Sequence, residues 1–281
     1  MPQKFLIAEA KTHNPLILQK KTSFVKDFDY TLASYSGCTY GCSYCYVPVV
    51  QHGLPDRRGG WGNYVDIRSR CIESLLKQRE KLTGASIFMS ATTDPYQPVE
   101  AQYRLTRAVL ETLAEIPFGF LLISTRSGLV LRDIDLFTDP RLQGRVEIGI
   151  SIPSDMPEIH AALEPKTALF IGRFTIARRL RDAGIPTRIH AAPLAMHSAD
   201  FVQCMADSAH WIWFDGAGHG AKTVEPGKSL LYDLAETRRF AREAARGIGK
   251  ERVGFGRVHY AWRWDRERGR IVPPLERKIL D

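Results

Sequence analysis

The sequence lacks any long apolar run. The first ten residues contain no hydrophobic core of signal-peptide length, and no segment reaches the roughly 18 consecutive apolar residues of a membrane-spanning helix. Internal repeats and low-complexity tracts are also missing, and nothing in the composition is typical of a disordered chain or a fibre. We therefore expect a folded, soluble protein of the cytoplasm.

Cysteine is sparse and unevenly distributed. The chain has five cysteines, an odd number, and three of them fall within eight residues while Cys71 and Cys204 stand alone. In a reducing compartment this clustering favours a metal site over a disulfide framework. Cys71 and Cys204 both lie in helical patterns, so we interpret them as buried structural residues.

Apolar residues and basic charge are both plentiful. With 281 residues, 44% of them hydrophobic, the chain can bury a sizeable core. The formal net charge is +8 and the sequence pI is about 9.3. Such a charge suits a polyanionic partner, nucleic acid above all, but an ordinary basic protein fits the same number equally well.

Strand and helix patterns alternate along most of the chain, which predicts βα units around a parallel sheet. A partial (β/α)6 barrel is the natural closure, with its active site at the carboxyl ends of the strands, and an open doubly wound sheet is the alternative. Strands are expected at residues 30–36, 85–90, 119–124, 145–151, 187–192 and 210–214.

Three regions are expected around this pattern. Residues 1–30 form an N-terminal extension, 31–247 the barrel, and 248–281 a basic, aromatic, hairpin-like C-terminal extension. Within the barrel, Asn63 is suited to cap a helix over residues 64–82.

The clustered cysteines form the pattern C-x3-C-x2-C at Cys38, Cys42 and Cys45, with Gly37 and Gly41 among them. Thiolates suit iron–sulfur clusters and zinc, and three cysteines on a short loop can bind three corners of a [4Fe–4S] cube and leave one iron open. The glycines let the backbone bend around a bulky cofactor. Alternatives are a zinc site lacking one ligand and three structural cysteines.

This motif, with the aromatic Tyr44 before the last cysteine, resembles the radical S-adenosylmethionine (SAM) superfamily. The resemblance implies a [4Fe–4S] cluster and SAM as cofactors, with the methionine amino and carboxylate groups of SAM on the open iron. It implies cleavage of SAM by one electron to a 5′-deoxyadenosyl radical, which abstracts a substrate hydrogen. It also implies an external electron donor of flavodoxin or ferredoxin type.

The resemblance extends to the spore photoproduct lyase-like branch over residues 32–193. Seven short stretches match in order: Tyr44-Cys45-Tyr46, Ala91-Thr92-Thr93-Asp94, Arg104-Leu105-Thr106, Ser124-Thr125-Arg126, Ser151-Ile152, Leu163-Glu164-Pro165, and Ala183-Gly184-Ile185-Pro186 with Ala192-Pro193.

Site residues follow from this second resemblance. Thr93 and Ser151 look like SAM-contacting hydroxyls, and Tyr44 is carried over as a further cofactor-binding residue. Arg126 stands where the lyase has a lysine near the SAM carboxylate. Tyr46 matches a tyrosine of the lyase's radical relay and is the catalytic candidate. Without the family, loop capping would explain Thr93 and Ser151, and a solvated surface charge would explain Arg126.

One position departs from the lyase. Ala91 replaces the cysteine that returns a hydrogen atom to the product radical, so photoproduct repair by the lyase's route is not expected. The tail over residues 250–278 mixes arginine and lysine with aromatics, which suits stacking on flipped or single-stranded bases, although a simple barrel cover fits equally. The predicted substrate is therefore a nucleic-acid base or nucleotide that is modified or rearranged. Alternatives are a peptide, a small metabolite, or a non-catalytic iron–sulfur protein that binds nucleic acid.

Overall fold

A computed structural model describes residues 5–19, 25, 28–50, 59–89, 91–216, 230–256, 263–265 and 270–272. One eight-stranded sheet organises these residues, in the order β11-β10-β9-β8-β7-β6-β3-β2. Its strands are β2 (Leu16–Leu18), β3 (Tyr30–Leu32), β6 (Ser86–Met89), β7 (Phe120–Thr125), β8 (Val146–Ser151), β9 (Thr187–Ala191), β10 (Trp211–Phe214) and β11 (Val253–Phe255).

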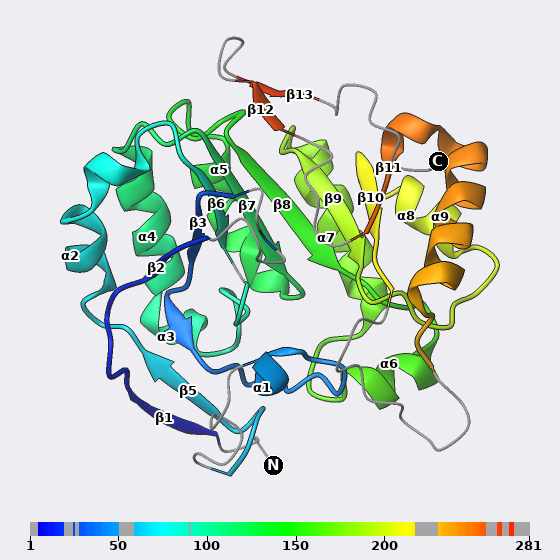
Figure 1. The fold of residues 1–281 in the computed structure, drawn as a ribbon, viewed down its shortest axis with the longest axis horizontal. Helices are drawn as coiled ribbons and strands as arrows, with labels where there is room; N and C mark the ends of the chain where they lie inside the picture. Colours follow the sequence, from blue (N-terminus) through cyan, green and yellow to red (C-terminus); the bar gives the residue numbers. More distant parts are fainter. Residues whose placement is uncertain are drawn as a thin grey trace.

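The sheet is parallel from β3 to β11, and β2 runs antiparallel to β3 at one edge. Among the described strands, β2 and β11 form two separate edges, so the sheet curves into a partial barrel without closing (Figure 1). Strands β3 to β10 supply the six parallel strands that the sequence predicts, and this fold class is confirmed. The sheet also continues past the predicted boundary at residue 247, because β11 pairs with β10.

Helices connect the strands. The described helical segments are α1 (Val47–Val50), α2 (Cys71–Leu76), η1 (Arg79–Leu82), α3 (Glu100–Tyr103), α4 (Leu105–Ala114), η2 (Gly128–Asp133), α5 (Ile134–Phe137), α6 (Pro157–Leu163), α7 (Phe170–Asp182), α8 (Phe201–Ala206), α9 (Leu234–Ile248) and η3 (Lys250–Arg252). Helix α9 begins with a capping box: Asp233 accepts from the Glu236 backbone N–H, and the Glu236 side chain accepts from that of Asp233. None of the described helices is long and apolar enough to cross a membrane.

A second, three-stranded sheet supports the cysteine loop. It contains β1 (Leu6–Glu9), β5 (Tyr64–Ile67) and β4 (Tyr35–Ser36), in the order β1-β5-β4. The prediction of one helix over residues 64–82 is therefore wrong at its start. The segment Tyr64–Ile67 is rich in residues that favour strands, three of its four side chains are buried, and its pairing partners come from distant parts of the chain.

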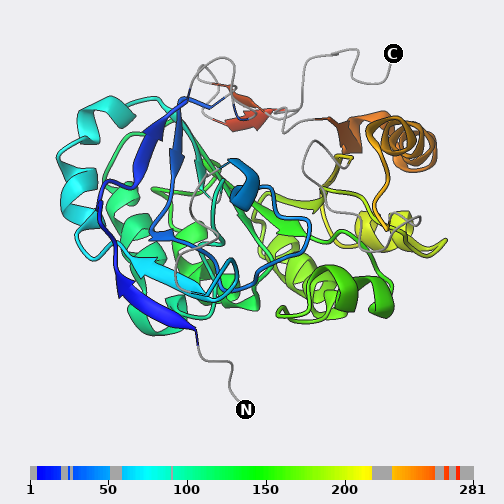
Figure 2. The ribbon, with the colours of Figure 1, turned by 60° about the horizontal axis from the view of Figure 1, so that its bottom comes forward.

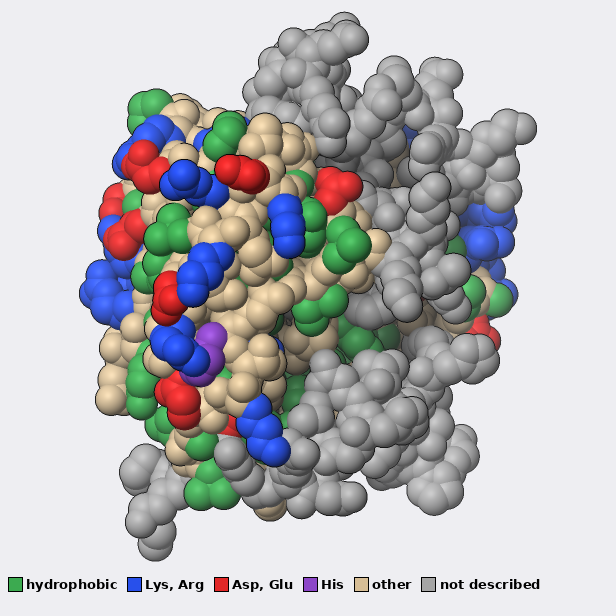
Figure 3. Space-filling view, turned by 60° about the vertical axis from the view of Figure 1, so that its left-hand side comes forward, with side chains coloured by type: hydrophobic (Ala, Val, Ile, Leu, Met, Phe, Trp, Pro, Cys, Tyr) green, Lys and Arg blue, Asp and Glu red, His purple; other side chains and the backbone are tan. Residues whose placement is uncertain are grey.

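The β11 end of the main sheet lies far from the second sheet. In Figures 1 and 2, α9 and β11 lie on the opposite side of the molecule from β1, β5 and α2. On the face turned forward in Figure 3, Lys and Arg alternate with Asp and Glu over the described part.

An antiparallel pair, β12 (Arg263–Asp265) and β13 (Arg270–Val272), forms within the predicted C-terminal extension. Tyr260 and Trp262 of that extension lie outside the described residues.

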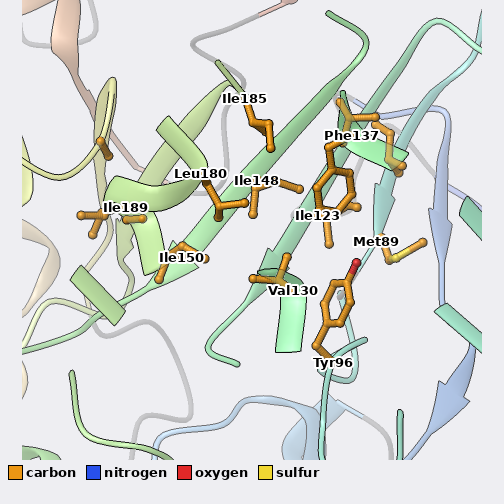
Figure 4. Close-up of a cluster of buried hydrophobic side chains, with 14 of the residues drawn as sticks. Met89, Tyr96, Ile123, Val130, Phe137, Ile148, Ile150, Leu180, Ile185 and Ile189 are labelled. Atoms are coloured by element: carbon orange, nitrogen blue, oxygen red, sulfur yellow. The ribbon is translucent and has the colours of Figure 1, made fainter. Parts of the chain in front are cut away.

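The main core fills the space between the sheet and its helices. Alternate strand residues such as Ile123, Ile148 and Ile189 pack with Leu180 of α7 in this core (Figure 4). Since side chains alternate across a strand, the residues between these isoleucines face the inner side of the curved sheet. That inner side is where the polar residues of the barrel gather.

Candidate active site

The three clustered cysteines lie on the loop that follows β4. The side chains of Cys38 and Cys42 are buried, Cys45 is half-buried, and all three carry free thiols. Tyr40 lies with Cys38 and Cys42 in one small buried cluster, and the Trp61 ring packs against it. The loop therefore holds three soft donors in a largely dry setting.

Two glycines are required for this loop to close. Gly37 has a φ of +82° and Gly41 a φ of +56°, in the left-handed region that side chains rarely adopt. A Cβ on Gly37 would approach the Tyr64 ring to 2.6 Å, and one on Gly41 would approach the Cα of Gly62 to 2.8 Å. Neither position has room for a side chain.

The segment after β6 holds the cysteine loop in place through hydrogen bonds. The Thr93 hydroxyl donates to the Gly37 carbonyl at 2.5 Å. The Gln97 amide nitrogen donates to the Thr93 hydroxyl at 2.9 Å, and its amide oxygen accepts from the Thr39 backbone N–H at 3.0 Å. Thr93, which the sequence predicts as a SAM contact, thus also anchors the loop. The role of Gln97 was not foreseen, although it lies only four residues beyond Thr93.

Arg126, just after β7, links the loop to buried acids. Its guanidinium donates to the Cys42 sulfur, to the Tyr44 hydroxyl at 3.2 Å and to the Glu164 carboxylate at 3.0 Å. Its backbone N–H donates to the Asp94 carboxylate at 2.9 Å. The structure therefore brings Arg126 and Tyr44, two predicted cofactor-binding residues, together with a predicted cluster ligand.

Glu164 joins this network to the end of β8. Its carboxylate is fully buried, lies 2.5 Å from an Arg173 guanidinium nitrogen and accepts from the Tyr44 hydroxyl. Burial alone would raise the pKa of Glu164, but Arg126 and Arg173 outweigh that effect and lower the pKa to about 2. Arg173 also donates to the Ser151 carbonyl at 2.9 Å. The sequence analysis named Glu164 only as part of a matching stretch. Its role was not predicted, because its partners Tyr44 and Arg126 lie far from it in the chain.

Burial also governs the thiols. It raises the pKa of Cys38 to about 11, with a further contribution from the negative charge of Asp94. Burial likewise raises the pKa values of Cys42 and Cys45, while the charge of Arg126 opposes the shift at Cys42. Binding iron requires thiolates, so loading a cluster here would release protons, and the Arg126 charge would favour the thiolate of Cys42.

The residues present fit an iron–sulfur cube. Each cysteine of such a cube binds a different iron, so its three sulfurs need not converge on one point. Consistent with this, no three His, Cys, Asp or Glu side chains of the described residues are grouped to hold a single metal ion. Arg126 adds a hydrogen bond to one sulfur, a contact of the kind that tunes such clusters.

Tyr46 and Ala91, two positions that the sequence analysis singled out separately, are neighbours. The Tyr46 hydroxyl donates to the Ala91 carbonyl oxygen. Burial raises the pKa of Tyr46, so the phenol stays protonated at neutral pH. Ser151 lies at the end of β8, where it pairs in register with His190 of β9.

Together, these residues form an α/β protein in which a three-cysteine loop packs against the segments that follow β6 and β7 of an open parallel sheet. Comparison with known families gives the class: the chain belongs to the radical SAM superfamily, whose family model matches residues 32–197, more than half of the chain. It is accordingly a radical SAM enzyme, and its cofactors are a [4Fe–4S] cluster and SAM.

Relatives and solved structures extend this result. An uncharacterized protein of Methanocaldococcus jannaschii is 28% identical over 69% of this chain and 70% of its own length. An uncharacterized protein of Mycobacterium tuberculosis is 26% identical over 62% of this chain, but the match spans only about half (52%) of that relative. Spore photoproduct lyase complexed with dinucleoside spore photoproduct has a TM-score of 0.62 at 16% identity, over 89% of this chain and 82% of the lyase.

A further radical SAM structure is similar in fold. Streptococcus suis SuiB bound to its precursor peptide SuiA has a TM-score of 0.58 at 14% identity, over 82% of this chain and 49% of SuiB. At these identities the two structural likenesses establish the fold. The spore photoproduct lyase-like fold predicted from the sequence is thereby confirmed.

Proposed function

We propose that Cys38, Cys42 and Cys45 bind three irons of the cluster and that SAM occupies the fourth. The support is their common loop, the burial of Cys38 and Cys42, and the two glycines that shape the loop. When bound, the cluster supplies the electron that cleaves SAM to methionine and a 5′-deoxyadenosyl radical. The chain's own residues then have to orient SAM and exclude water.

Four further residues are suited to bind SAM. The Arg126 guanidinium lies against Cys42 and offers a cation for the methionine carboxylate. Glu164 and Asp94 fix Arg126 in that position before any ligand arrives. Tyr44 offers a hydroxyl beside Arg126, and Thr93 and Ser151 are the other proposed hydroxyl contacts for SAM.

The proposed substrate is a base of a nucleic acid or a nucleotide, which the enzyme modifies or rearranges. The observation that carries this proposal is the basic surface on α9. This helix has four arginines and two glutamates, and Arg242 and Arg246 line a surface hollow with Lys250. Cations arranged in this way suit phosphates. The similarity to a lyase that was solved with a dinucleoside points in the same direction.

The return of a hydrogen atom to the product radical is the step at which this chain must differ from the lyase. Ala91 carries no thiol, so it cannot donate a hydrogen atom. Tyr46 is the candidate for a radical-relay role, because its protonated hydroxyl lies against the Ala91 carbonyl. We accordingly expect no repair of spore photoproduct. We further expect an electron donor of flavodoxin or ferredoxin type and a location in the cytoplasm.

A peptide substrate is the second candidate. It is favoured by the similarity to SuiB, which was solved with a precursor peptide. The SuiB match covers less of this chain and only half of SuiB, whereas the lyase match covers most of both proteins.

The test uses anaerobically reconstituted protein with SAM and dithionite. The first measurement is formation of 5′-deoxyadenosine, which reports the radical chemistry without any knowledge of the substrate. The second is the increase of this product when single-stranded DNA, RNA, nucleotides or peptides are added in parallel. Stimulation by peptides alone would overturn the nucleic-acid proposal and leave the radical SAM chemistry intact.

A further inference from the structure

The inner face of β9 carries two buried polar atoms without a hydrogen-bond partner. They are the Nε2 of His190 and the Nη1 of Arg188, and neither has a partner among the described residues. The His190 side chain is 8% exposed and that of Arg188 1%. Buried polar groups are almost always paired, so two orphans on one face of one strand indicate a missing partner.

Both side chains face away from the helices. Ile189 and Ala191 alternate with them along β9 and lie in the main core. Arg188 pairs in register with Gly149, and His190 pairs with Ser151. His190 therefore lies directly beside Ser151, the residue proposed to contact SAM, and Arg188 lies two positions earlier on the same face of the strand.

A missing side chain makes room for the imidazole. A Cβ on Gly149 would come within 2.9 Å of the His190 ring, so only glycine lets that ring lie across β8. The ring reaches Ser124 of β7, whose hydroxyl is 2.9 Å from Nδ1. This contact fixes the imidazole and leaves Nε2 as its one unused polar atom.

The neighbouring wall is aromatic. Trp213 of β10 is buried on the same face, and its indole N–H donates to the Gly256 carbonyl at 3.0 Å. The Arg188 guanidinium carbon lies 6.0 Å from the centre of the indole ring. The indole ring thus lies near the Arg188 guanidinium, and Trp213 pairs in register with His190.

The charge on this face is balanced. Glu147 binds Arg188 through Nε and Nη2, the latter at 2.6 Å, which leaves Nη1 unused. Burial, together with the charge of Arg188, lowers the pKa of His190 well below its ordinary value, so the imidazole is neutral. A face with hydrogen-bonding capacity but no net charge suits a neutral planar group better than a phosphate or carboxylate.

We propose that Arg188 Nη1 and His190 Nε2 bind the polar edge of the substrate's nucleobase, next to SAM and bordered by Trp213. Arg188 would donate to a carbonyl oxygen of the base, and His190 would pair with a second polar atom of the same edge. This inference rests on the proposed nucleic-acid function. Solvent reaches neither atom, so the bonds formed with the base would be shielded from water.

The test compares two oligonucleotides on the reconstituted, SAM-loaded protein. One is a ten-nucleotide single strand of thymidines, and the other has the same phosphates with abasic sites. Wild type is expected to prefer the thymidine strand. His190→Phe keeps a ring of similar shape and removes both nitrogens, so its Kd for the thymidine strand should rise about tenfold, with little change for the abasic strand. His190→Gln, which restores an amide, should recover part of the preference.

Thermal stability separates binding from a structural role. His190→Phe removes an unpaired buried polar atom at the expense of one hydrogen bond to Ser124, so its Tm should stay close to that of wild type. Unchanged preference for the thymidine strand in a folded His190→Phe variant would overturn the inference alone. Equal wild-type binding of both strands would also overturn it while leaving phosphate binding in place. No binding of either strand would overturn the proposed nucleic-acid function together with the inference.

Discussion

Replacing Glu164 with glutamine tests the buried network most directly. The substitution keeps the size of the side chain but removes the negative charge that Arg126 and Arg173 share. All of Glu164 and Arg173 is buried, and Arg126 is largely so, which means that water cannot compensate for the loss. Removing one partner of a buried ion pair typically costs about 3–5 kcal/mol.

At about 2–4 °C per kcal/mol for a chain of this size, the Tm should fall by about 10 °C. Thermal unfolding followed by circular dichroism measures this shift. The matched control is Glu115→Gln, the same chemical change in the exposed ion pair with Arg141, which should leave the Tm unchanged. SAM affinity gives a second readout, because Glu164 also orients Arg126. A Glu164→Gln protein as stable as its control, with wild-type SAM affinity, would refute the reasoning.

Three other predictions concern the cofactors and the partner. Replacing Cys38, Cys42 or Cys45 with alanine should abolish the roughly four irons of the reconstituted protein, measured by iron analysis and visible absorption, whereas Cys204→Ala should retain them; a colourless wild type with one zinc would contradict this. Arg126→Ala should weaken SAM binding by about 1.5–3 kcal/mol in equilibrium titrations, and unchanged affinity would remove Arg126 from the site. Oligonucleotide affinity should fall steeply with salt, and a lesion-containing oligonucleotide should not be repaired; a salt-independent Kd or efficient repair would each count against the proposal.

The parts of the site that are local in sequence could be predicted. The three cysteines and their two glycines lie on one short loop, so their spacing indicated a soft-metal site, and the resemblance to the radical SAM superfamily implied the cluster. The alternation of strands and helices could also be predicted, because most strands of the parallel sheet are short segments rich in apolar and β-branched residues between turns. Both features depend on residues close together in the chain.

What could not be predicted depends on pairing between distant residues. The segment Tyr64–Ile67 was predicted to be helical. Its strand partners β1 and β4 come from other segments, so the local sequence did not indicate the pairing. The sequence around Glu164 did not indicate that its carboxylate would form buried ion pairs with Arg126 and Arg173. His190 also went unnoticed, although its signal was present: polar residues at alternate positions of a strand in a barrel face the interior, where polarity needs a reason.

The buried charges have a consequence for cofactor binding. Asp94 and Glu164 balance Arg126 and Arg173 through three ion pairs, so none of these four charges is left without a partner. Such a network is costly to desolvate, but that cost belongs to folding and does not recur when a ligand binds. Arg126 is therefore held against the cysteine loop before SAM arrives, and binding need not order it. The charges of the network come from separate elements: Asp94 follows β6, Arg126 follows β7, Glu164 ends α6 and Arg173 lies on α7. Each element that positions a charge before SAM binds reduces the motion that SAM would otherwise have to restrict.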